Sequence, residues 1–179
     1  MDLSSRELWT ALHGMVFGAA FLLAFTGGFM TLWALRSEWI TDEGARRSVR
    51  RLIVWTWSMA ALAWLTVILG TYVVYPWYRA KPPAGTGGAM LAQYPKYLLL
   101  SSPRTADWHE FGMEWKEHVA WLAPILATAV AFVVTRYRGQ LAADAHVRRA
   151  LLILYSLAFF TASVAGLLGA LINKAAPMR

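Results

Sequence analysis

The sequence predicts an all-α integral membrane protein, built as a bundle of four transmembrane helices. Hydrophobic residues make up 58% of the 179-residue chain, and its mean hydropathy is +0.43. This is too apolar for a typical soluble domain. Four apolar runs are each long enough to cross about 30 Å of hydrocarbon, which takes about 20 residues of helix. Because only a helix pairs all its backbone groups within one such run, we expect a single membrane domain over residues 1–179.

The spans are expected at about residues 8–35, 52–77, 114–135 and 150–172. The first run is long, and its flank holds both acid and base, which favours a retained transmembrane helix over a cleaved signal. Proline and glycine punctuate residues 78–112, which predicts an outer loop. Within that loop we expect a short helix or turn around residues 98–100, lying on the membrane surface.

Arginines in the two short connections predict the orientation. Residues 36–51 hold five arginines and residues 136–149 hold four, and short basic loops are cytoplasmic. We therefore expect a multi-pass protein of a bacterial inner membrane, with both termini outside. The net charge of +7 then reflects topology and membrane lipid headgroups. We do not expect nucleic acid as a partner, since no nucleic-acid-binding motif is present.

A charged segment leads into the third span. Glu110, Glu114 and His118 are four residues apart, so they share one helix face. Ionisable groups inside a bilayer usually face a bundle interior and mark function, and this face carries two acids and an imidazole into the membrane. Glu114 is the candidate catalytic residue, as a proton relay beside a redox site. An ordinary charged border of the span, paired at the headgroups, explains the glutamates equally well.

The two halves of the chain resemble each other, and each has a histidine, a span, an arginine-rich turn and a second span. They read as a tandem repeat of two helical hairpins, related by an axis along the membrane normal. That symmetry gives His13 and His118 equivalent depths in the outer leaflet.

Two imidazoles at one depth across a bundle can supply both axial ligands of a haem. We expect one haem b with His13 and His118 as metal ligands, and with Gly14, Gly18 and Gly70 giving the macrocycle room. A chlorophyll-type pigment, a bare metal site and a purely structural role stay open, because G-x-x-x-G spacing also serves ordinary helix packing. The chain has no cysteine, which excludes thiolate, iron–sulfur and covalent c-type haem sites.

The other two histidines lack a matched partner. His109 lies nine residues before His118 and so faces nearly the opposite side of a straight helix; we expect it in the loop or interface, near a propionate, a quinone or solvent. His146 is expected to be a solvated loop residue. A di-iron site is excluded because the other spans hold no interior carboxylate.

On His13, His118 and the glycines, residues 8–172 resemble the small four-helix membrane cytochromes b, which include quinone-linked anchors of respiratory enzymes. The two histidine pairs of the b561 type are absent. The resemblance implies an electron-transfer subunit that passes electrons between a quinone pool and a partner redox protein outside, together with other subunits of a membrane redox complex. The alternative is a non-redox accessory subunit of a respiratory or photosynthetic complex that binds pigment or lipid. A transporter is disfavoured, because no charge lies at mid-membrane.

Overall fold

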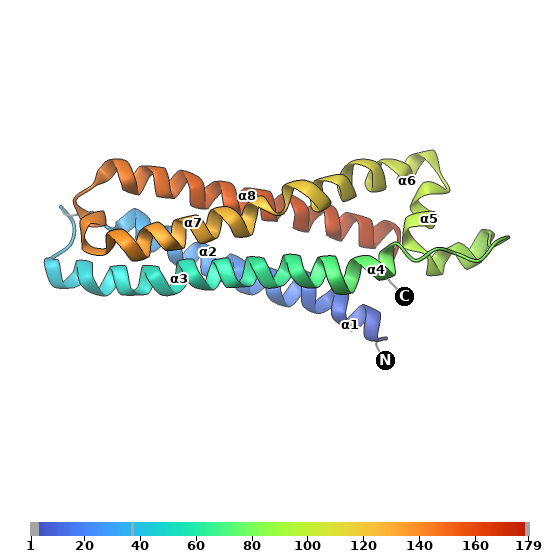
Figure 1. Ribbon diagram of the computed structural model, residues 1–179, viewed down its shortest axis with the longest axis horizontal. Coiled ribbons are helices and arrows are strands. Elements are labelled where there is room, and N and C mark those ends of the chain that lie inside the picture. Colours follow the sequence, from blue (N-terminus) through green and yellow to red (C-terminus); the bar gives the residue numbers. More distant parts are fainter. Residues whose placement is uncertain (1–3, 37, 178–179) are drawn as a thin grey trace. The chain divides into compact units, whose positions relative to one another are not determined.

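The computed structural model describes residues 4–36 and 38–177, and it is all-helical there (Figure 1). Helix makes up 86% of the structure. Four helices are long and apolar enough to cross a membrane, namely Ser5–Ala34, Asp42–Tyr78, Pro103–Ala142 and Ala145–Ala175. The prediction of an all-α chain with four candidate spans is thereby confirmed. At a rise of about 1.5 Å per residue, each helix is longer than the roughly 30 Å hydrocarbon layer.

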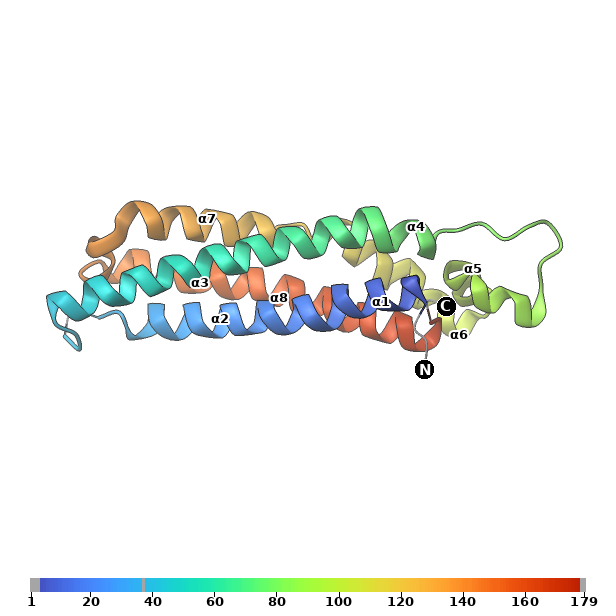
Figure 2. The same ribbon diagram turned by 90° about the horizontal axis from the view of Figure 1, so that it is seen from below.

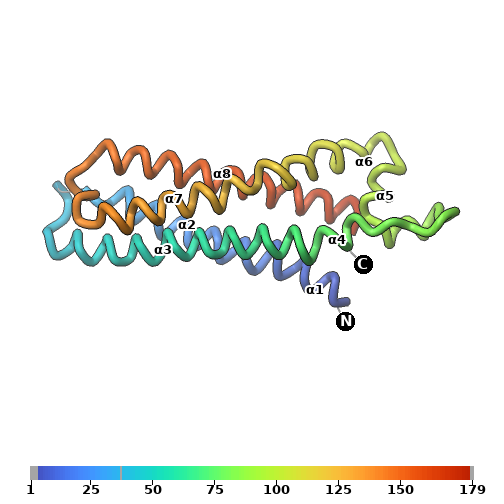
Figure 3. The backbone as a smooth tube through the Cα atoms, viewed as in Figure 1, coloured from blue at the N-terminus to red at the C-terminus, as the bar shows by residue number. Residues whose placement is uncertain are grey.

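Three of the long helices contain π-helical turns, and Figure 3 traces the course of the backbone through them. The first consists of α1 (Ser5–Ala11), the π turn η1 (Leu12–Val16) and α2 (Phe17–Ala34). The second consists of α3 (Asp42–Leu69), the π turn η2 (Gly70–Val74) and α4 (Tyr75–Tyr78). The third consists of α6 (Pro103–Asp107), the π turns η4 (Trp108–Met113) and η5 (Trp115–Val119), α7 (Leu122–Tyr137) and the 3₁₀ turn η6 (Arg138–Ala142). The fourth is α8 (Ala145–Ala175).

The two short connections are shorter than the sequence suggests, because their arginines extend the helices. The Thr41 hydroxyl accepts a hydrogen bond from the Gly44 N–H at 3.2 Å, so α3 begins well before its arginines. The Asp144 carboxylate accepts from the Val147 N–H at 3.0 Å and so caps α8. Arg148 donates to the carbonyls of Leu141 and Ala142 at 2.8 and 2.7 Å, which gives partners to the end of the preceding helix.

The connection after α4 contains two short helices (Figure 2). They are the 3₁₀ helix η3 (Gly88–Gln93) and α5 (Pro95–Leu100). Pro95 occupies the first turn of α5, where a missing N–H costs nothing. The short helix predicted around residues 98–100 is confirmed as α5, and its Leu99 is buried.

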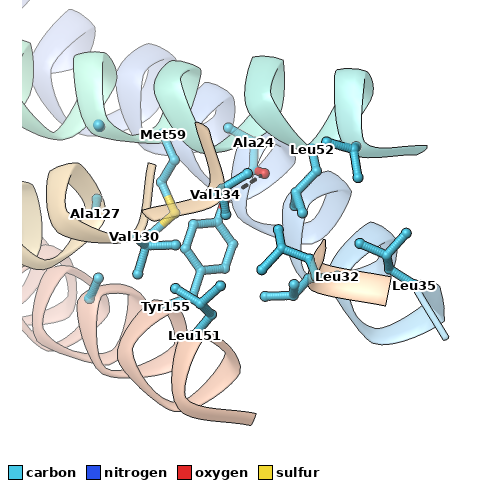
Figure 4. Close-up of a cluster of buried hydrophobic side chains, with 14 of the residues drawn as sticks. Ala24, Leu32, Leu35, Leu52, Met59, Ala127, Val130, Val134, Leu151 and Tyr155 are labelled. Atoms are coloured by element: carbon cyan, nitrogen blue, oxygen red, sulfur yellow. Dashed lines mark hydrogen bonds between the residues drawn. The ribbon is translucent and has the colours of Figure 1, made fainter. Parts of the chain in front are cut away.

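The chain forms two compact units, each with its own hydrophobic core. Unit 1 comprises Met1–Gly18, Leu65–Trp121 and Ser163–Arg179, and unit 2 comprises Ala19–Trp64 and Leu122–Ala162. The core of unit 1 is built from Tyr78, Leu99, Met113, Ile172 and Ala176. The larger core of unit 2 centres on Tyr155, as Figure 4 shows.

Aromatic side chains and glycines lock the core of unit 2. The Tyr155 hydroxyl donates to the Ala24 carbonyl at 3.1 Å, and the Phe25 and Phe159 rings stack with centroids 4.0 Å apart. A Cβ at Gly28 would collide with the Tyr155 hydroxyl, so only glycine lets these helices approach so closely. Unit 2 is therefore a close-packed core whose buried hydroxyl has a partner.

Candidate functional site

Within the described ranges, every π-helical turn belongs to unit 1, and three of the four carry a histidine. His13 lies on η1, His109 on η4 and His118 on η5, while η2 begins at Gly70. The remaining histidine, His146, is exposed on the regular helix α8. Since π turns are rare and often occur at functional sites, their coincidence with the histidines points to unit 1 as the candidate site.

Pro124 accounts for the end of the last π turn. The Ala120 N–H bonds to the Trp115 carbonyl at 3.2 Å, which is π-helical pairing. Pro124 has no N–H to offer the Ala120 carbonyl four residues earlier. The helix accordingly passes through a turn at residues 120–121 before α7 begins at Leu122.

His13 is half-buried and packs directly against Gly70 of η2. A Cβ at Gly70 would lie 2.7 Å from Cε1 of the imidazole, so the ring occupies the space that glycine leaves. The Thr66 backbone provides the ring with a hydrogen bond, but its Nδ1 is buried without any partner. A buried ring nitrogen in this state is uncommon and calls for an explanation, and it gives His13 one nitrogen free for a ligand.

Lys116 of η5 packs inward in the same way against Gly169 of α8. A Cβ at Gly169 would lie 2.5 Å from its Nζ, and the amine lies within electrostatic range of His13. The two ion pairs of the described residues, Glu43–Arg47 and Glu114–His118, do not involve it. A half-buried amine without a carboxylate partner among the described residues is costly, and ionisable groups inside a membrane domain usually mark function.

From the sequence, Lys116 reads as part of an ordinary charged border of the span, although a signal for its inward position exists. Gly112 and Ala120, four residues to either side, are buried, and a Cβ at Gly112 would lie 3.2 Å from Ile172. Residues four apart on a helix share a face. The inward face of this segment is therefore the one that carries Gly112, Lys116 and Ala120.

The helix face that was expected to point into the bundle, with its two glutamates and a histidine, is exposed instead. Glu110, Glu114 and His118 are all exposed. Nδ1 of His118 lies 3.0 Å from the Glu114 carbonyl oxygen and 3.4 Å from its carboxylate. The expectation of an inward-facing acidic surface is thus corrected, because small residues rather than the glutamates provide the close contact with α8. The His118 ring is oriented by its own helix through Nδ1, and no residue described by the structure hydrogen bonds to its Nε2.

A second polar cluster joins the end of the second long helix to η4 and η5. The Tyr75 hydroxyl donates to the Glu117 carboxylate, and the Tyr78 hydroxyl hydrogen bonds to Nδ1 of His109 at 2.9 Å. The two tyrosine rings stack with centroids 6.1 Å apart. Glu117, which the sequence analysis did not single out, is therefore the glutamate of this segment that has a partner on another helix. Carboxylate, phenol and imidazole groups in contact can hold and transfer protons.

The three glycines proposed to give a macrocycle room have different surroundings. Gly70 contacts the His13 ring, as described above. Gly14 and Gly18 are exposed, and a Cβ at either position would meet no atom within 4 Å. Among the residues with described positions, no group of three or more histidines and carboxylates could hold a bare metal ion.

We predict that replacing Lys116 by methionine stabilises the protein. Lys116→Met keeps the length of the side chain and removes a half-buried amine that forms neither of the ion pairs of the described residues, which is often favourable. The unfolding temperature in detergent should rise by several degrees, since about 1 kcal/mol shifts a chain of this size by roughly 2–4 °C. Lys174→Met, at an exposed position of α8, is the control and should change little. A lower unfolding temperature for Lys116→Met would show that the amine stabilises the fold.

Comparison with known proteins assigns the chain to no family. No protein-family model, no curated protein and no solved structure matches it. The function proposed next rests on the side chains of unit 1.

Proposed function

We propose that this chain is a membrane b-type cytochrome subunit, which passes electrons between a quinone pool and a partner redox protein on the outer side. The observation that carries this proposal is the His13 imidazole, whose Nδ1 is buried without a partner on a π turn. A neutral imidazole is a typical haem ligand. Four long apolar helices are the usual scaffold for such a site.

His118 is the proposed second ligand. Its Nδ1 is engaged by the Glu114 carbonyl, which would fix the tautomer and leave Nε2 available, as is common for ligating histidines. Each imidazole would therefore offer one nitrogen of a type that haem iron accepts, with His13 packed against Gly70 and His118 on the exposed face of its helix. When bound, the haem supplies one-electron transfer, and the protein orients it and sets its potential. The π turns beneath both histidines support the proposed repeat of two hairpins.

The remaining polar groups of unit 1 are proposed to manage charge and protons. Lys116, near His13, would supply positive charge beside the site. Glu117, bonded to Tyr75, would accept the proton that a quinol releases when it is oxidised. The sequence favoured Glu114 for this role, but Glu117 has the partner on a neighbouring helix and is the better supported of the two.

We further propose that the protein lies in a bacterial inner membrane with both termini outside. The arginines at the starts of α3 and α8 support this orientation, because basic residues near span ends favour the cytoplasmic side. Cysteine introduced at the exposed Gln140 should then resist an impermeant thiol reagent in intact cells, whereas cysteine at Ala84 should react. Labelling of the cysteine at position 140 but not of the cysteine at position 84 would show the opposite orientation.

The reduced visible spectrum tests the main proposal. Purified protein should show the absorbance of one haem b after reduction with dithionite. His13→Ala and His118→Ala should each lose the haem or leave it five-coordinate, because each removes one axial nitrogen. His146→Ala, at an exposed position of α8, is the control and should leave the spectrum unchanged.

Other outcomes of the same experiment would redirect the proposal. Haem lost with His109→Ala but kept with His118→Ala would move the site to the tyrosine cluster. Complete absence of haem from the wild-type protein would favour the second candidate, a non-redox accessory subunit of a respiratory or photosynthetic complex that binds pigment or lipid. The exposed position of His118 on the outer face of its helix is the observation that favours this candidate.

We predict that Glu117→Gln impairs the proton-coupled step while leaving the haem bound. The amide keeps the shape of the side chain and removes the proton acceptor, so quinol-linked haem reduction should slow by about 10²-fold and lose its dependence on pH. Glu114→Gln, three residues away and exposed, is the matched control and should change the rate less than about two-fold, as expected for an exposed charge. If Glu114→Gln has the larger effect, the role belongs to Glu114.

A further inference from the structure

Unit 2 contains a groove between α3 and the C-terminal end of α7. Its lining residues are Trp57, Phe132, Thr135, Arg136 and Arg138, and its volume is about 480 Å³. Both helices belong to candidate spans, and the groove lies where α7 gives way to the arginine-bearing connection. It combines an apolar floor with a cationic rim.

The floor is apolar because its polar atoms already have partners. The Trp57 indole N–H donates to the Thr135 hydroxyl at 2.9 Å, and that hydroxyl donates to the Ala131 carbonyl at 2.7 Å. The two aromatic residues themselves remain open to the surroundings, with Trp57 42% exposed and Phe132 63% exposed. In a bilayer, surfaces of this kind contact acyl chains and the interface.

The rim holds two guanidinium groups, one of them on a strained backbone. Arg138 has φ +41°, a left-handed conformation that the neighbouring Gly139 would adopt at less cost. Its Nε donates to the Thr135 carbonyl at 3.1 Å, so the side chain turns back over the end of α7. Neither Arg136 nor Arg138 forms an ion pair with a carboxylate of the described residues. Both therefore retain N–H groups that suit a phosphate.

We infer that this groove binds one anionic phospholipid, with its phosphate on Arg136 and Arg138 and an acyl chain along Trp57 and Phe132. Charge complementarity selects the headgroup, because the rim carries two unpaired cations. The apolar floor selects a lipid over a free phosphate, which has nothing to place there. Basic pockets at the ends of transmembrane helices bind anionic lipids in this way. The inference is independent of the haem site proposed for unit 1.

The chain provides a matched control surface. A second concave surface of unit 2, on α3, is lined by Glu43, Arg46, Arg47, Arg50 and Arg51. It is at least as basic, but no aromatic side chain lines it, and Arg47 is already paired with Glu43. Removing two arginines there changes the net charge equally without touching the apolar floor.

Native mass spectrometry of the purified full-length chain tests the inference. The protein in detergent is titrated with phosphatidylglycerol, with phosphatidylcholine and with inorganic phosphate. The wild type should retain one phosphatidylglycerol at concentrations about ten-fold below those needed for phosphatidylcholine. The Arg136→Gln/Arg138→Gln variant should lose that preference, whereas Arg46→Gln/Arg50→Gln should keep it. Phe132→Ala, which leaves every arginine in place, should weaken retention of both lipids several-fold.

Three results would overturn the inference. Equal retention of the two lipids by the wild type would remove the headgroup preference. Equal losses in the two arginine variants would reduce the effect to net charge. Displacement of phosphatidylglycerol by inorganic phosphate at equal concentration, with Phe132→Ala behaving as wild type, would leave only an anion site. If Arg136→Gln/Arg138→Gln does not fold, the Phe132→Ala titration and the wild-type lipid preference still decide.

Discussion

Unit 1 depends on one kind of contact, in which a side chain that ends in a polar nitrogen group packs into the space above a glycine. His13 lies against Gly70 and Lys116 lies against Gly169, so each of the four long helices contributes one member of these two pairs. The glycines let an imidazole and an amine lie where a larger residue would exclude them. The imidazole and the amine therefore lie among apolar side chains, although both are polar groups that normally require a hydrogen-bond or ion-pair partner. The small core built on Tyr78 and Met113 joins the helices that carry Gly70, Lys116 and Gly169.

The two units differ in whether their buried polar groups have hydrogen-bond partners. In unit 2, the Thr56 hydroxyl bonds to the Leu52 carbonyl at 2.9 Å and Tyr155 bonds to Ala24, so its buried hydroxyls have partners. The buried side-chain nitrogens without a partner, His13 Nδ1 and Trp115 Nε1, both belong to unit 1 among the residues described. A stable core satisfies its polar groups, whereas sites that bind ligands leave some of them open. This contrast is the physical reason for placing the candidate histidine site in unit 1.

Hydropathy and length were enough to predict the four long helices and the short helix α5, because these depend on composition and on proline positions. The facing of the third helix could not be predicted in the same way. The spacing of Glu110, Glu114 and His118 was interpreted on a regular helix, which has 3.6 residues per turn. Those three residues do share a face, but it is the exposed one. The inward face is the one with small residues, where Lys116 lies between the buried Gly112 and Ala120. Glu117 was missed for a related reason, since its partner Tyr75 lies 42 residues away and no local pattern links them.

The π turns also determine where the sequence can gain or lose single residues. A π turn closes over five residues where an α turn closes over four, so it holds one residue more than the regular helix needs. Deleting a single residue from Leu12–Val16 or from Trp115–Val119 would let the helix continue as an ordinary α-helix on either side. The histidine-bearing turns are therefore the places where one-residue insertions and deletions can be accommodated without loss of the span. A deletion of this kind removes the extra residue of the turn, so the α-helices on either side keep their facing. The change falls on the residues of the turn itself, which include those that pack against Gly70 and Gly169.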